Sequence, residues 1–148
     1  MPIASSLLER KARAGAPEVA TVAPDATVLD AAKRMNELRI GATPVVEDSG
    51  RIVGMFTERD ILMKIVALDR SPREVLVREV MSSPVIAAGP DASVDELRHV
   101  MTTQRIRHIP VVEDGRLLGI ISIGDLNVAQ VEVMTETITY LEQYMYGP

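Results

Sequence analysis

The chain has 148 residues, no cysteine and a formal net charge of −5, with 47% hydrophobic and 25% charged residues. A chain of this length can bury a sizeable core without cross-links, and the lack of cysteine excludes disulfides, thiolate nucleophiles and zinc–thiolate clusters. The acidic balance argues against a protein that neutralises many phosphates of a nucleic acid.

The first segment, residues 1–16, predicts a short amphipathic helix. It carries Arg10, Lys11 and Arg13 against Glu9, and it lacks the apolar stretch of about 7–15 residues that a secretory signal needs. No apolar run in the chain approaches the roughly 18–20 residues of a membrane span. We therefore expect a cytoplasmic protein that does not enter a membrane.

Residues 17–68 form the first of two similar segments. The sequence PDATVLDAAKRMNELRIGATPVVEDSGRIVGMFTERDI at 24–61 aligns with PDASVDELRHVMTTQRIRHIPVVEDGRLLGIISIGDL at 90–126, with one gap opposite Ser49. Both contain Pro-Asp-Ala, then Pro-Val-Val-Glu-Asp, and then a Gly and an Asp at matching positions. Self-similarity over such a length indicates two copies of one structural unit.

Each copy predicts the element order β-α-β-β-α. A short β-prone piece, at 19–22 or 85–87, precedes a helix capped by Thr27 or Ser93. Pro-Val-Val then starts a strand, Glu-Asp-(Ser)-Gly a hairpin turn and IVGMFT or LLGIIS the returning strand, before a second helix. Because one copy has a small core, we expect an α/β (α+β) fold in which two copies pack sheet to sheet.

The rest of the chain predicts a linker and a long final helix. Residues 69–83 form the linker, residues 84–128 the second copy and residues 129–148 a helical extension. The extension has an apolar seam with spacings of three and four residues, made of Val131, Met134, Ile138, Leu141 and Met145. Such a seam suits a homodimer, and packing within the chain is the alternative. The acidic extension and the basic first segment also predict a salt-dependent contact between the two ends.

The motifs RIGATPVVEDSGRIVGMFTERDI and RIRHIPVVEDGRLLGIISIGDL resemble the CBS (cystathionine β-synthase) domain. The resemblance covers roughly residues 17–128 and implies two repeats related by pseudo-two-fold symmetry, with clefts that bind adenosine-containing ligands. AMP, ADP or ATP is the expected regulatory ligand, and S-adenosylmethionine or NAD is the alternative. The resemblance also implies a homodimer that regulates a separate, unidentified protein.

By this resemblance, the Thr/Ser-x-x-Asp element of each copy binds the ligand's ribose and phosphate. The element consists of Thr57 and Asp60 in the first copy and of Ser122 and Asp125 in the second. An ionised carboxylate only accepts hydrogen bonds, so it can take both donors of a ribose cis-diol. The same spacing is a helix-capping motif, which leaves capping as the alternative role of these four residues.

The resemblance also implies an adenine site and a phosphate site. The adenine positions are Val19, Ala20, Val85, Ile86, Pro44 and Pro110, any of which could instead belong to the core. Arg107 and His108 replace Gly41 and Ala42 of the first copy, and there they would reach phosphates. The alternative is a solvated Arg107 and a half-buried His108. Arg59 gains no support from the repeat, because its matched residue is a glycine.

We expect neither a catalytic nor a metal site. The sequence has two histidines and lacks GxxxxGK[ST], GxGxxG and HExxH. The basic run from Arg105 to His108 has no aromatic platform beside it, which argues against nucleic-acid binding. The expected function is a regulatory binding module, and a structural or protein-interaction dimer with empty clefts is the rival.

Overall fold

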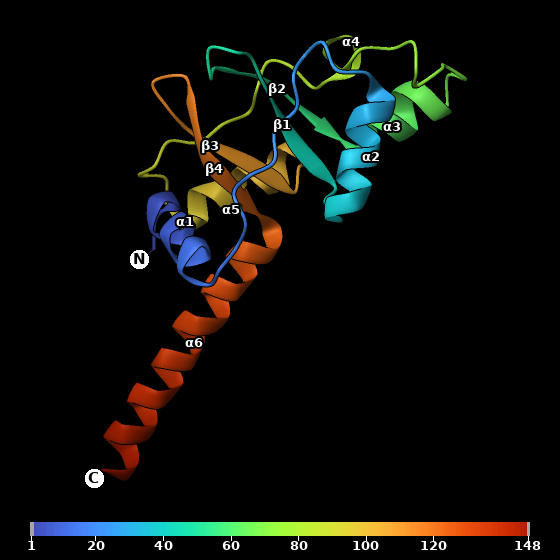
Figure 1. The fold of residues 1–148 in the computed structure, drawn as a ribbon. Coiled ribbons are helices and arrows are strands. Elements are labelled where there is room, and N and C mark those ends of the chain that lie inside the picture. Colours follow the sequence, from blue (N-terminus) through green and yellow to red (C-terminus); the bar gives the residue numbers. More distant parts are fainter. Residues whose placement is uncertain (1, 148) are drawn as a thin grey trace.

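The computed structural model describes residues 2–147 and contains two helix-and-hairpin units with one further helix at each end (Figure 1). The elements are α1 (Ala4–Arg13), α2 (Val28–Leu38), β1 (Ala42–Val46), β2 (Ile52–Thr57), α3 (Glu58–Ile61), the π-helix η1 (Leu62–Val66), α4 (Val77–Val80), α5 (Val94–Gln104), β3 (His108–Glu113), β4 (Arg116–Ser122) and α6 (Ile123–Tyr146). The predicted fold class is confirmed.

The two hairpins are built alike. β1 pairs with β2 and β3 with β4, both antiparallel, and both registers shift at the same place, between Val45 and Val46 and between Val111 and Val112. Gly50 and Gly115 have positive φ in the hairpin turns, where a glycine avoids the steric penalty of a side chain. The predicted repeat is therefore visible at the level of single residues.

The first strand of each copy is shorter than the sequence predicts. It is a single parallel bridge, from Val22 to Val45 in the first copy and from Ala88 to Val111 in the second. The next rung of each ladder would need an N–H from the residue that precedes Val45 or Val111. That residue is Pro44 or Pro110, and proline has no N–H to donate.

The helices begin where the capping residues predict. Thr27 Oγ1 accepts the N–H of Asp30 at 3.1 Å, and Ser93 Oγ accepts the N–H of Glu96 at 3.1 Å. The second helices, which the sequence predicts from Asp60 and Asp125, begin two residues earlier at Glu58 and Ile123, because Thr57 and Ser122 are their N-caps. The linker helix α4 is four residues long and shorter than expected.

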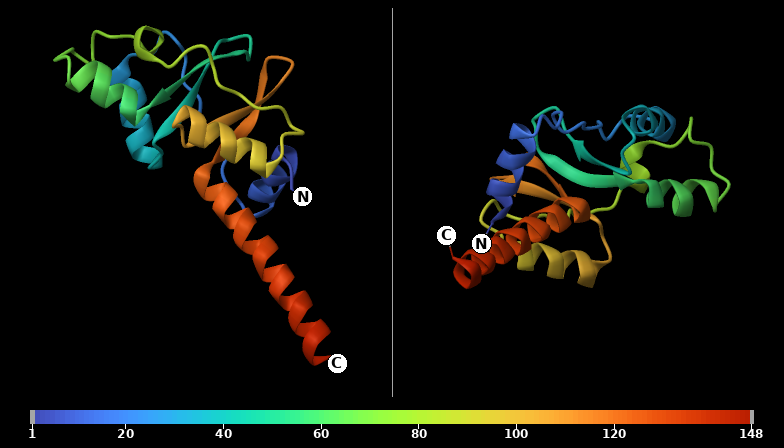
Figure 2. Two further views of the ribbon diagram at one scale, coloured as in Figure 1. Left: turned by 180° about the vertical axis from the view of Figure 1, so that it is seen from behind. Right: turned by 90° about the horizontal axis from the view of Figure 1, so that it is seen from below.

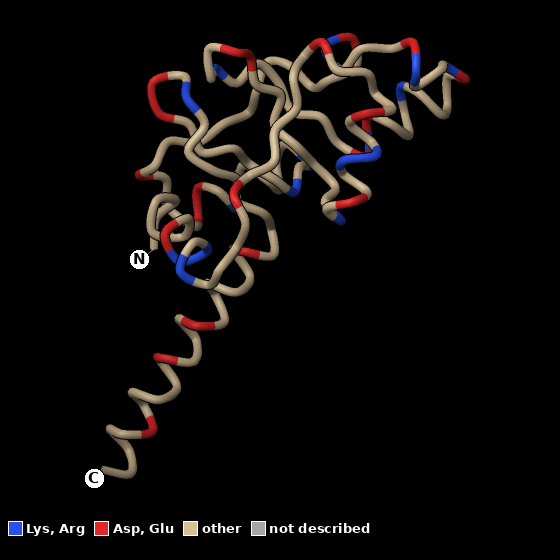
Figure 3. Tube along the Cα trace, viewed as in Figure 1, with Lys and Arg blue, Asp and Glu red and all other residues tan. Residues whose placement is uncertain are grey.

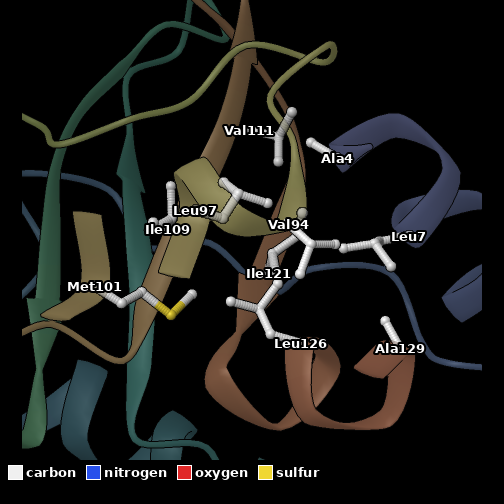
Figure 4. Close-up of a cluster of buried hydrophobic side chains, with 10 residues drawn as sticks. All are labelled: Ala4, Leu7, Val94, Leu97, Met101, Ile109, Val111, Ile121, Leu126 and Ala129. Atoms are coloured by element: carbon white, nitrogen blue, oxygen red, sulfur yellow. The ribbon is translucent and has the colours of Figure 1, made fainter. Parts of the chain in front are cut away.

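The repeats have separate cores and a shared seam. The first core gathers nine buried side chains around Phe56. The second contains Leu97, Ile121 and Leu126, and α1 adds Ala4 and Leu7 to it (Figure 4). Ala42, Met55 and Ile120 form a third cluster between the hairpins, so the predicted packing of sheet against sheet is present. The first helix of the chain thus belongs to the second repeat.

The last helix projects from the body of the molecule (Figures 1 and 2). Leu126 and Ala129 are its buried residues. Beyond them α6 carries acidic side chains and no Lys or Arg up to residue 147, whereas α1 is basic near its end (Figure 3). Arg10 forms an ion pair with Glu132, so the two ends meet as the charge pattern predicts. Within residues 2–147, no helix is both long and apolar enough to cross a bilayer.

Candidate functional site

A cleft of about 880 Å³ lies between the two repeats. We call it the first cleft. The first repeat contributes the end of β2, α3 and η1, and the second repeat contributes the segment before α5, the end of α5 and the start of β3. Its lining includes six of the predicted site residues, namely Thr57, Asp60, Val85, Ile86, Arg107 and His108, and also Arg59, which the repeat did not support.

Asp60 lies at the inner end of this cleft and is 5% exposed. Its carboxylate accepts the Thr57 N–H at 3.0 Å, the Ser82 hydroxyl at 3.1 Å and Lys64 Nζ at 2.9 Å. Thr57 Oγ1 in turn accepts the Asp60 N–H at 3.2 Å. The capping role is therefore formed, and the buried charge is compensated by a cation and by hydrogen bonds, as a buried carboxylate requires.

Asp125 has a similar cap but a different cation. Its carboxylate accepts the Ser122 N–H at 2.7 Å, and its own N–H donates to Ser122 Oγ at 3.2 Å. The residue that matches Lys64 is Ala129, and the cation comes instead from Lys11 of α1, whose Nζ lies 2.9 Å from Asp125 Oδ2. The charge pattern predicts a contact between the basic first segment, which includes Lys11, and the acidic stretch from Asp125 onward, but it does not predict that Lys11 binds the carboxylate of the Ser-x-x-Asp element.

The predicted adenine residues divide into three places. Val85 and Ile86 line the first cleft. Val19 lines a second cavity of about 500 Å³, between α1, residues 16–21 and β4. Pro44 and Pro110 are fully buried inside their strands, and Ala20 is partly exposed. The structure therefore brings the Val85 pair to the Asp60 site and separates it from the prolines.

The carbonyls of Ala20 and Ile86, which lie opposite Pro44 and Pro110 in the two copies, differ in their hydrogen bonding. Because Pro44 has no N–H, the Ala20 carbonyl accepts the Thr43 hydroxyl instead, at 2.8 Å. The residue that matches Thr43 is Ile109, which has no donor in its side chain. Among the described residues, no hydrogen bond reaches the Ile86 carbonyl, and Ile86 is one of the residues that line the first cleft. The mismatch of Thr43 and Ile109 was visible in the aligned copies but was not used.

The charged residues of the first cleft are mostly basic. Its lining contains the cations Arg59, Lys64, Arg105 and Arg107 and the carboxylates of Glu58 and Asp60. With four cations and two carboxylates, the lining has a formal net charge of +2. A phosphate group would therefore meet a favourable potential in this cleft, with guanidinium groups able to bind it in bidentate fashion.

His108 starts β3 at the same cleft and is half-buried, whereas Arg107 is exposed. Burial lowers the pKa of His108 below its ordinary value of 6.5. The charges of Asp125 and Glu58 act in the opposite direction, and Lys11 and Arg107 add to the lowering. His108 is therefore neutral at pH 7 in the ligand-free protein.

This pKa shift predicts a loss of stability in mild acid. The unfolded chain binds a proton at His108 below about pH 6.5, whereas the folded chain binds it only at lower pH, so the free energy of unfolding falls as the pH drops from about 6.5 toward the lowered pKa. The His108→Gln protein should lose less stability between pH 7.5 and 5, as measured by melting temperature. His99→Gln, on the exposed face of α5, is the matched control. Identical pH profiles for wild type and His108→Gln would contradict the prediction.

Comparison with known proteins decides the family. The CBS domain family matches residues 15–67 and 77–139, which includes both copies. The chain belongs to the CBS domain family. The CBS domain-containing protein YhcV of Bacillus subtilis is 39% identical over 113 residues, which cover 76% of this chain and 79% of YhcV.

Solved structures agree on the CBS fold. A CBS-domain containing protein from Agrobacterium tumefaciens has a TM-score of 0.78 at 36% identity, covering 87% of this chain and 99% of that one. The CBS domain pair of protein MJ0100, solved with 5′-methylthioadenosine and S-adenosyl-L-methionine, has a TM-score of 0.75 at 26% identity and covers 89% of this chain and 98% of its own. A tandem CBS pair is thus confirmed.

Proposed function

We propose that this CBS pair is a regulatory module that binds an adenosine nucleotide in the first cleft and thereby changes the activity of a separate protein. The observation that carries the proposal is the composition of that cleft. It joins a carboxylate on a helix start, a backbone carbonyl without an internal donor and an excess of positive charge. The carboxylate can accept hydrogen bonds from a ribose, the carbonyl can accept one from the adenine amino group, and the positive charge attracts a phosphate.

The charge of the cleft favours a phosphorylated ligand. MJ0100 binds two adenosine compounds without phosphate, which supports an adenosine ligand for a CBS pair of this fold. In the present chain, the cations Arg59, Lys64 and Arg107 would repel the sulfonium of S-adenosylmethionine and attract phosphate. We therefore propose AMP, ADP or ATP as the ligand in preference to S-adenosylmethionine, and NAD, which also carries phosphate, is the alternative.

Regulation requires two states that bind the nucleotide differently, because a ligand shifts an equilibrium only by its differential affinity. Asp60 supplies a physical basis for such a difference. Its oxygens are shared between Ser82 of the linker and Lys64 of η1, and a ribose hydroxyl would replace one of these donors. Binding would then alter the contact between the linker and η1 at the wall of the first cleft.

We further propose a cytoplasmic homodimer that pairs through α6. The seam residues Val131, Met134, Ile138, Leu141 and Met145 are between 48% and 69% exposed in the single chain. A row of large apolar side chains on one helix face is typical of a surface that another helix covers. This feature also supports the rival function, a dimer that acts as a protein-interaction scaffold with empty clefts.

A thermal-shift experiment separates the two functions. If ATP binds only to the folded chain, a concentration of 100 times its Kd should stabilise the protein by about 2.7 kcal/mol, which corresponds to a rise of about 5–10 °C in melting temperature. AMP and ADP should act in the same direction, and GTP at the same concentration is the control for base recognition. If no adenosine compound shifts the melting temperature at millimolar concentration, the proposed nucleotide binding is wrong and the scaffold function is favoured.

A further inference from the structure

We infer that the two clefts of this CBS pair are unequal by construction. A ligand enters the first cleft, whereas the chain's own helix α1 takes the place of a ligand in the second, so that each chain binds one nucleotide. The identity of the ligand rests on the proposed function. The occupation of the second cleft by α1 does not, because it follows from contacts within the chain.

The carboxylate of the second cleft is bound by α1. Lys11 Nζ donates to Asp125 Oδ2 at 2.9 Å and to the Ile120 carbonyl at 2.8 Å. A ribose hydroxyl that approached Asp125 would have to displace this charge-assisted hydrogen bond. Lys64 holds Asp60 in the same way, 2.9 Å from Oδ1 and 2.8 Å from the Val80 carbonyl, but it does so at the wall of an open cleft, whereas Asp125 lines neither of the two cavities described above.

The adenine side of the second cleft is also satisfied internally. The carbonyl of Ala20 corresponds to that of Ile86 in the first cleft, and it accepts the Thr43 hydroxyl at 2.8 Å. Thr43 is 1% exposed, so this hydrogen bond is formed inside the protein. The carbonyl position therefore distinguishes the two clefts, because it is satisfied inside the protein in the second and has no donor among the described residues in the first.

The phosphate side of the second cleft lacks the cations of the first. In the aligned copies, Arg59, Lys64 and Arg107 of the first cleft correspond to Gly124, Ala129 and Gly41. Of the four lining cations, only Arg105 has a basic counterpart, Arg39. A nucleotide in the second cleft would consequently find little positive potential for its phosphates.

The body of helix α1 is fixed in this position by its own packing. Its Ala4 and Leu7 are 0% and 3% exposed and belong to the second core. The N–H groups of Ala4 and Ser5 donate to the carbonyls of Ala92 and Pro90, at 2.8 and 2.9 Å. Removing Lys11 from Asp125 by moving the helix would therefore disrupt the packing of a core.

Side chains hold the helix against β4 as well. Leu8 lies over Gly119 so closely that a Cβ at this glycine would come within 2.7 Å of Leu8 Cδ2. The space left beside α1 is the cavity of about 500 Å³, and its lining includes Lys11 and Gly119 but neither Ser122 nor Asp125. Helix α4 is held against the first repeat in the same way, since a Cβ at Gly54 would come within 2.5 Å of Met81 Sδ, but there the side chains of Lys64 and Ser82 face an open cleft of about 880 Å³.

Titration calorimetry of the intact protein with ATP tests the stoichiometry. We expect one ATP per chain for the wild type, and Asp125→Asn should leave the stoichiometry and the affinity within about 2-fold of wild type. Two ATP molecules per chain would overturn the inference. So would a loss of about 10-fold or more in affinity on replacing Asp125, because the second cleft would then be the one that is used.

A ligand-free experiment keeps the inference testable if no nucleotide binds. We compare the melting temperatures of Lys11→Met, Asp125→Asn and the double variant, since such a cycle isolates the interaction between two side chains. The double variant should lose less than the sum of the two single losses. Additive losses would show that Lys11 does not occupy Asp125, whatever the outcome of the nucleotide titrations.

The pair at the first cleft provides the matched comparison. Lys64→Met and Asp60→Asn form the corresponding cycle, with both residues on one helical segment in an i, i+4 arrangement. Adding saturating ATP should change the coupling of this pair, because the ligand competes for Asp60. The coupling of Lys11 with Asp125 should be the same with and without ATP, and a change there of the same size would contradict the inference.

Discussion

Replacing Asp60 with asparagine is expected to lower the affinity for ATP by about 10- to 150-fold, which corresponds to about 1.5–3 kcal/mol for a hydrogen bond to a charged group. Asparagine keeps an oxygen that can accept the Thr57 N–H, so the helix cap is largely retained. It loses the charge and one of the two acceptor oxygens that a ribose diol would use. The affinity is measured by calorimetry on protein that is still folded.

Stability and binding must be kept apart in this experiment. The variant also weakens the contact with Lys64, so the ligand-free protein should lose about 0.5–2 kcal/mol, as for a damaged cap. Asp125→Asn is the matched control, because it changes an equivalent cap in the other copy. If both variants lose stability and neither loses affinity, the two aspartates are caps and the nucleotide site lies elsewhere.

Charges placed on the α6 seam are expected to separate the proposed dimer. Met134 and Ile138 are each 55% exposed in the single chain. Burial of a large apolar side chain contributes about 1.5–3 kcal/mol, and a symmetric dimer buries each of them twice. The double variant Met134→Glu, Ile138→Glu should therefore raise the dimer Kd by about 100-fold or more, as measured by sedimentation velocity over a range of concentrations.

The control for this experiment is a pair of charges on the opposite face of α6. Thr139→Glu with Gln143→Glu adds the same residue type to the same helix, away from the seam. This variant should remain dimeric. A dimer that survives both double variants would place the contact outside the seam, and a monomeric wild type would contradict the homodimer itself.

The elements of the fold could be predicted because each depends on neighbouring residues. Thr27 and Ser93 mark helix starts through their own side chains, and the hairpins follow from glycines in short turns. The short first strand could have been predicted in the same way, since Pro44 lacks the N–H that the ladder needs. The proline is visible in the sequence, but its effect on the ladder can be predicted only once the segment around Val22 is known to pair with β1.

The inequality of the clefts was only half visible in the sequence. The replacement of Gly41 by Arg107 between the copies pointed to different phosphate sites. The charge pattern predicts that the basic first segment meets the acidic stretch from Asp125 onward, but the exact pair of Lys11 with Asp125, 114 positions apart, depends on how α1 docks. Periodicity identifies α1 as amphipathic, but it does not reveal which core its apolar face completes.

The docking of α1 on the second core has a consequence for biosynthesis. Ala4 and Leu7 are synthesised well before their packing partners Leu126 and Ala129. The first core contains only residues between Val28 and Val80, so the first repeat can form while the apolar face of α1 is still exposed and waits for the second core. The same contact ties the start of the chain to the second repeat across the whole of the first, which favours folding and unfolding of the pair as one cooperative unit.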